Sequence, residues 1–68
     1  MDKANRLQEI MGERNLSHKQ LARMSGVSSA TIGRIERCEA DPKQSTMIAI
    51  SKALKLEVCD VFNLNWKR

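Results

Sequence analysis

Apolar residues in this 68-residue chain recur mostly three or four positions apart, which is the spacing of one face of a helix. In the first such segment, residues 3–14, Leu7, Ile10 and Met11 fall on one stripe. No segment shows the sustained alternation of apolar and polar residues that is typical of a half-buried strand. The pattern therefore predicts an all-α protein of five short helices.

The second helix is predicted from a start signal followed by apolar positions. Ser17, with Gln20 three residues later, forms the S-x-x-Q version of a capping box. Asn15, two residues before Ser17, is a plausible left-handed end for the first helix. Leu21 and Met24 then supply the apolar side of the second helix. We expect both residues to point toward the core.

A very tight turn separates this helix from the third. Gly26 can take the positive φ that a sharp turn needs at no steric cost. Ser28 is placed to cap a third helix that runs to about Arg37, with Ile32 and Ile35 inward. Two helices joined by a turn of three or four residues that contains glycine have the geometry of a helix-turn-helix.

The remaining chain is predicted to hold a loop and two more helices. Asp41-Pro42 is a turn signal, and a fourth helix follows to about Leu54. Its start is open, because Lys43 is a poor cap and Ser45 is the better one. The expected inward residues are Met47, Ile50 and Leu54 in the fourth helix, and Val58, Val61 and Phe62 in a short fifth one.

Length and composition restrict the function. Sixty-eight residues form one domain, residues 1–68, with room for a single core and no deep substrate cleft. Cys38 and Cys59 show no metal-ligand or redox spacing, and His18, the single histidine, has no nucleophile pattern beside it. We therefore expect no enzyme activity, no metal, no cofactor and no small-molecule ligand. Without a signal peptide or membrane-spanning run, a cytoplasmic protein with no membrane partner is expected.

The net charge of +4 is concentrated in one segment. Residues 14–37 carry five bases against one acid, Glu36, whereas seven bases and seven acids balance elsewhere. A basic patch suggests a polyanionic partner, although a solvated face without a partner is the alternative. The side of the third helix away from its isoleucines is also nearly bare of bulky groups: Ser29, Ala30, Gly33 and Arg34. A helix with such a face fits the major groove of B-DNA, which is about 12 Å wide.

The stretch LSHKQLARMSGVSSATIGRIE, a loop with Pro42, and IAISKALKLEVCDVF together resemble the Cro/C1-type (XRE family) helix-turn-helix domain. The similarity covers residues 6–62 and leaves 63–68 as a tail. The resemblance implies a compact, lambda-repressor-like domain of five helices. It also implies a sequence-specific regulator of transcription, a repressor that binds double-stranded DNA and is usually dimeric.

Four positions depart from the family pattern. Met11 stands where relatives commonly have an arginine that pairs with the glutamate of the third helix. Glu36 therefore needs another partner, and Arg14 and Arg37 are the candidates. The other departures are Cys38 and Lys55, where a glycine often ends the third and fourth helices, and Gln44, at a usually apolar position.

The resemblance also assigns roles in DNA binding. Base contacts fall to Ser29, Ala30 and Arg34, and the Arg34 guanidinium is suited to bridge guanine O6 and N7. The alternative for Arg34 is a solvated surface arginine, since most protein–DNA hydrogen bonds go to the backbone. The expected phosphate contacts are Ser17 and His18 at the start of the second helix, and Thr31, Arg37 and Lys43.

Two apolar residues near the C-terminus have no obvious place in so small a core. Leu64 and Trp66 are expected to form a homodimer interface, so that two copies read a palindromic operator. Trp66 folded back over its own domain is the alternative. A second function class also stays open: a protein-interaction module, an antitoxin or adaptor, that uses the helix-turn-helix as a scaffold. No ligand-sensing domain is expected beside the DNA-binding unit.

Overall fold

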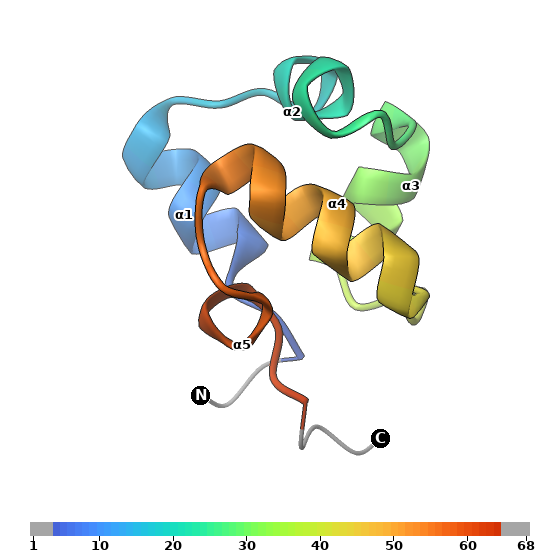
Figure 1. The fold of residues 1–68 in the computed structure, drawn as a ribbon. Coiled ribbons are helices and arrows are strands. Elements are labelled where there is room, and N and C mark those ends of the chain that lie inside the picture. Colours follow the sequence, from blue (N-terminus) through green and yellow to red (C-terminus); the bar gives the residue numbers. More distant parts are fainter. Residues whose placement is uncertain (1–3, 65–68) are drawn as a thin grey trace.

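A computed structural model describes residues 4–64 of the chain (Figure 1). These residues form five α-helices and no β-strand. The helices are α1 (Leu7–Arg14), α2 (His18–Ser25), α3 (Ser29–Glu36), α4 (Gln44–Leu54) and α5 (Val58–Val61). In Figure 1, α4 lies centrally, with α1, α2 and α3 around it and α5 below. The predicted all-α fold of five helices is confirmed.

The helix boundaries around the tight turn follow the predicted capping signals. The Ser17 hydroxyl accepts a hydrogen bond from the Gln20 backbone N–H at 3.1 Å, and the Gln20 side chain accepts one from the Ser17 N–H at 2.8 Å. Gly26 has φ 76°, in the left-handed region, and the Ser28 hydroxyl accepts from the Thr31 N–H at 3.2 Å. Asn15 ends α1 with φ 54°, as predicted.

The core is almost entirely aliphatic and draws on every helix. Phe62 is its one aromatic member among the described residues, at 3% exposed. The other buried apolar residues are Leu7, Ile10, Met11, Leu21, Ile32, Ile35, Ile50, Leu54 and Val61. Met47 and Val58 pack against this cluster while remaining partly exposed. No helix within residues 4–64 is long and apolar enough to cross a bilayer.

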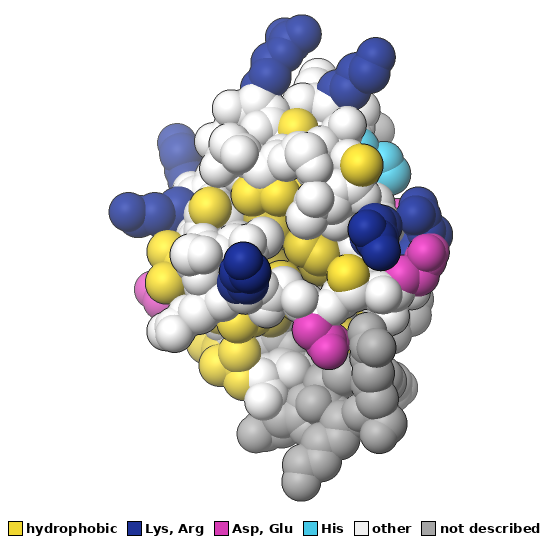
Figure 2. Space-filling view, turned by 90° about the vertical axis from the view of Figure 1, so that its right-hand side faces the viewer, with side chains coloured by type: hydrophobic (Ala, Val, Ile, Leu, Met, Phe, Trp, Pro, Cys, Tyr) yellow, Lys and Arg dark blue, Asp and Glu magenta, His cyan; other side chains and the backbone are white. Residues whose placement is uncertain are grey.

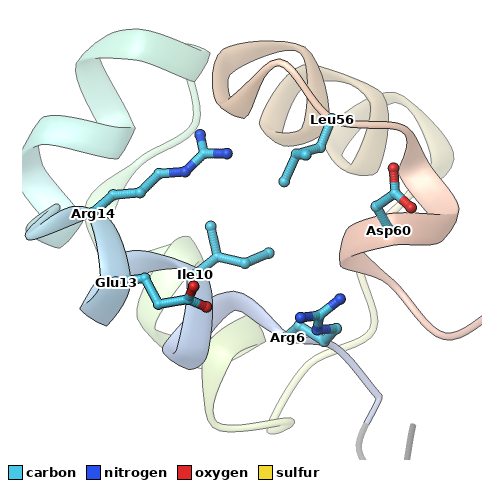
Figure 3. A pocket seen from close by; sticks show the side chains of 6 residues that line it. All are labelled: Arg6, Ile10, Glu13, Arg14, Leu56 and Asp60. Atoms are coloured by element: carbon cyan, nitrogen blue, oxygen red, sulfur yellow. The ribbon is translucent and has the colours of Figure 1, made fainter.

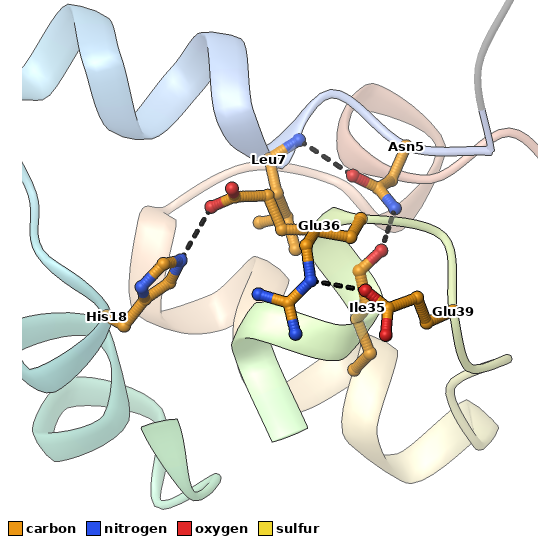
Figure 4. Close-up of polar contacts among 7 residues, drawn as sticks. Asn5, Leu7, His18, Ile35, Glu36 and Glu39 are labelled. Carbon is orange, nitrogen blue, oxygen red and sulfur yellow. Dashed lines mark hydrogen bonds and ion pairs between the residues drawn. The ribbon is translucent and has the colours of Figure 1, made fainter. Parts of the chain in front are cut away.

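The first helix begins at Leu7 and not at residue 3. Ahead of it, Asn5 pairs with Phe62 in an isolated antiparallel bridge. The Asn5 amide donates to the Ile35 carbonyl at 2.7 Å, and its oxygen accepts from the Leu7 N–H at 3.1 Å (Figure 4). This buried side chain therefore binds the first backbone N–H of α1 and ties the start of that helix to the end of α3. Helical periodicity carries no signal for such a long-range polar contact.

The prediction that Met24 points toward the core is wrong, and the start of the fourth helix, left open by the sequence, is now defined. Met24 is 51% exposed, whereas Leu21 is the buried residue of α2 and Val27 packs partly buried against the core. The fourth helix starts at Gln44 with Lys43 as its N-cap, although Lys43 makes no side-chain capping bond, so Ser45 lies inside the helix.

Cys38 and Lys55 both adopt φ 60°, the left-handed conformation that glycine usually supplies. The departures from glycine at these positions thus leave the chain path intact. A residue with a Cβ adopts this conformation at a steric cost, and a bend follows each of the two residues in the chain.

Ser51 on α4 is 2% exposed, and its hydroxyl has no hydrogen-bond partner within the described residues. Since an unsatisfied buried hydroxyl costs roughly 1–3 kcal/mol, Ser51→Ala is expected to raise the free energy of unfolding by about 1 kcal/mol. Thermal denaturation measures the change, and Ser45→Ala, an exposed serine of the same helix, controls for helix propensity. A gain no larger than that of Ser45→Ala would contradict the assignment.

Candidate nucleic-acid interface

The helix-turn-helix is built from α2, the turn at Gly26 and α3. The two helices pack against each other, and α2 also packs against α4. Ile32 and Ile35 are 0% and 1% exposed, which fixes the rotation of α3 about its own axis. The opposite side of α3 is consequently directed away from the core.

Two of the three predicted base-contact residues lie exposed on that outer side. Ala30 and Arg34 are exposed, and Ser29 is half-buried. The Arg34 side chain makes no hydrogen bond or ion pair within the described residues. Figure 2 shows the side of the molecule that carries α3 and the start of α4, with basic side chains projecting around a partly hydrophobic centre. The structure thus leaves the Arg34 guanidinium available for an external partner.

Gly33 does not belong to the exposed face, contrary to expectation. It is buried, and an added Cβ would lie 3.2 Å from Nη1 of Arg37. The expectation of a bare outer side at this position assumed an exposed residue. Gly33 instead provides the space in which the Arg37 guanidinium lies along the helix.

The predicted phosphate-contact residues lie at helix ends. Ser17 caps α2 and is exposed, and Lys43 caps α4 and is exposed. Thr31 is exposed in the first turn of α3, and its hydroxyl accepts a hydrogen bond from the Ser28 hydroxyl at 2.8 Å. These side chains are accessible from solvent without rearrangement of the helices.

Arg37, the residue after α3, is a further phosphate candidate and is paired with Glu39. Both side chains are more than half exposed, at 55% and 53%. An exposed pair of this kind contributes about 0–1 kcal/mol. Arg37 can therefore exchange this carboxylate for a phosphate at little cost.

Glu36 pairs with His18, and neither predicted partner contacts it. His18 Nε2 donates to the Glu36 carboxylate at 2.7 Å (Figure 4). Arg14 instead donates to the Leu54 carbonyl at 2.6 Å, where it satisfies the end of α4. The prediction of Arg14 or Arg37 is therefore wrong. The sequence did not single out His18, since Lys19 is a second basic residue at the start of α2.

The predicted dimer residues are only partly described. Leu64 is 63% exposed, the most exposed of the large apolar residues in the described part of the chain. Trp66 lies outside the described residues.

A separate open hollow of about 540 Å³ lies between α1, α5 and the segment joining α4 to α5 (Figure 3). Two bases and two acids line it, so their charges offset each other. Its residues are Arg6, Ile10, Glu13, Arg14, Leu56 and Asp60, and none belongs to α2 or α3. Residues 4–64 contain no cluster of three His, Cys, Asp or Glu that could hold a metal ion.

Comparison with known proteins agrees with this geometry. A family model described as "Helix-turn-helix" matches residues 7–61, which include all five helices. The chain is also 46% identical, over 44 residues, to the control protein C.SmaI of Serratia marcescens. That match covers 65% of this chain, and the chain spans about half (52%) of the length of its relative. The match over most of the chain, together with the helix order and the Gly26 turn, shows that the protein belongs to the Cro/C1-type (XRE) helix-turn-helix family of DNA-binding transcription regulators.

Proposed function

We propose that the protein is a sequence-specific regulator that binds double-stranded DNA, inserts α3 into the major groove and acts as a repressor. The observation that carries this proposal is the outer side of α3, where Ala30 and Arg34 are exposed and the Arg34 side chain is unpaired within the described residues. These residues belong to the segment, 14–37, that holds the whole net charge.

The geometry supports two sets of contacts, one to the base edges and one to the phosphate backbone. Ser29, Ala30 and Arg34 read base edges: the guanidinium bridges guanine O6 and N7, and the Ala30 methyl group contacts a thymine methyl. The backbone N–H groups at the start of α2, with Ser17 and His18, hold a phosphate with the help of the helix dipole. Thr31, Arg37 and Lys43 hold further phosphates and set the register of α3 in the groove.

The proposed regulatory effect is repression by occupation of the operator. A protein seated in the major groove excludes other proteins from the same base pairs. The name of the relative, control protein, supports a role in regulation.

The proposed DNA-binding form is a homodimer. One α3 helix reaches only a few base pairs, whereas two copies on a two-fold axis read two half-sites about 34 Å apart. Leu64, 63% exposed just after α5, and Trp66 are the proposed contacts. An exposed leucine at this position is a natural contact for a second copy, because the inward faces of the helices are already committed to the core.

Selection of bound sites from random duplex DNA tests the function. The expected consensus is an inverted repeat whose half-site centres lie about one helical turn apart. A consensus with a single half-site would contradict the dimer. The absence of any enriched sequence would contradict the DNA-reading function and favour the interaction module.

A further inference from the structure

Glu36 is the one acid in the basic segment 14–37, and its charge opposes DNA binding. It is the last residue of α3, the helix proposed to enter the groove. Its side chain is 17% exposed, so the carboxylate is largely held within the protein. A carboxylate in this place repels phosphates, and electrostatics alone therefore gives no reason for its presence.

The carboxylate joins the two far ends of the helix-turn-helix. His18 is the first residue of α2 and Glu36 is the last of α3, and their 2.7 Å hydrogen bond links the ends that lie opposite the turn (Figure 4). The turn at Gly26 connects the helices at their near ends. The pair and the turn thus restrain the angle between α2 and α3 from both sides.

His18 and Glu36 are the only ionisable residues among those that line the hollow around the pair. The shallow hollow around it is otherwise lined by uncharged residues: Gln8, Met11, Gly12, Asn15, Leu16 and Ser17. Glu36 makes no other ion pair or side-chain hydrogen bond within residues 4–64. Loss of either partner would therefore remove the whole contact, and none of the other residues that line the hollow carries a charge to replace it.

We infer that the His18–Glu36 pair is a clasp that positions α3 for DNA reading, which makes Glu36 a positioning residue whose charge nevertheless opposes binding. This inference rests on the proposed DNA-reading function. Base contacts need α3 at one angle and depth in the groove, whereas phosphate contacts tolerate small changes of both. Loss of the clasp therefore lowers the affinity for the selected site more than the affinity for random DNA.

The sign of the effect separates this role from simple electrostatics. Removal of an acid from a DNA-binding surface strengthens binding if the charge acts alone. Removal of a clasp weakens binding to the selected site. Glu36→Ala removes both the charge and the acceptor, so the two accounts predict opposite changes.

The test compares Glu36→Ala with Glu9→Ala, which makes the same change of net charge. Glu9 pairs with Arg6 at 3.1 Å on the surface of α1, and this hydrogen bond, with the Coulombic attraction, raises the pKa of Arg6. The measured quantity is the ratio of affinities for the selected duplex and for a random duplex of equal length. Glu36→Ala is expected to lower the ratio about tenfold, equivalent to about 1.4 kcal/mol. Glu9→Ala is expected to leave it unchanged, and Glu36→Gln, which keeps an acceptor oxygen, to restore most of it.

The affinities are measured at a temperature at which circular dichroism shows each variant to be folded. If Glu36→Ala does not fold, His18→Ala breaks the same hydrogen bond and is expected to lower the ratio of affinities in the same way. Loss of a phosphate contact by itself would lower both affinities equally and would leave the ratio unchanged. A ratio equal to that of Glu9→Ala in the folded variant would overturn the clasp. A wild type that does not distinguish the two duplexes would instead overturn the proposed function.

Discussion

The affinity of the protein for its selected duplex is expected to fall about 150-fold when the salt concentration rises from 50 to 200 mM. Each phosphate neutralised by a cation releases counterions, and the logarithm of the affinity falls with the logarithm of salt at a slope of about −0.9 per contact. Arg37 and Lys43 supply two such contacts in each copy. A dimer therefore makes four, which corresponds to a slope of about −3.6.

Titrations of labelled duplex at several salt concentrations measure this slope. Lys43→Ala removes one contact per copy and is expected to make the slope less steep by about 1.8 in a dimer. Lys55→Ala, an exposed base at the end of α4 outside the proposed interface, serves as the control and is expected to leave the slope unchanged. A wild-type slope near zero would show that the phosphate assignments are wrong.

Arg34→Ala is expected to abolish the preference for one base pair in each half-site. A bidentate contact from arginine to guanine contributes roughly 1–3 kcal/mol of discrimination, and alanine cannot replace it. The other positions of the consensus should keep their preferences, because Ser29 and Ala30 remain in place. Repeated site selection with the variant measures the change position by position.

The matched control for this variant is Lys43→Ala, which also removes one positive charge. Since Lys43 is proposed to hold a phosphate, its loss should weaken all sites alike and leave the consensus unchanged. If Arg34→Ala kept the complete wild-type consensus, another residue would have to be the base reader.

The helices and the turn between α2 and α3 could be predicted from the sequence because their causes are local. Ser17 and Gln20 bond to groups three residues away, and Gly26 meets a requirement of its own φ. The core stripes follow from periodicity and were correct for Ile32 and Ile35. The outward position of Arg34 follows from those two residues, since it depends only on the rotation of one helix.

Features that depend on distant residues could not be predicted in this way. Asn5 forms a hydrogen bond with Ile35, 30 positions away in the sequence, and lies outside the first helix, which begins at Leu7. The partner of Glu36 is 18 positions away and depends on how α2 meets α3. Gly33 was assigned to the exposed face by periodicity, but the side chain of Arg37 covers it. In each case the contact is determined by how one helix or segment packs on another. The spacing of residues along the chain carries no information about that packing.

Methylation interference on the selected duplex tests the central claim, that α3 reads the major groove through Arg34, most directly. Guanine N7 lies in the major groove and adenine N3 in the minor groove, so methylation of each reports on one groove. We expect N7 methylation to block the wild type at guanines in two clusters about one helical turn apart, and the block at the guanine read by Arg34 to be lost in Arg34→Ala. Binding that tolerates N7 methylation throughout the site, or that is blocked by adenine N3 methylation alone, would contradict the account.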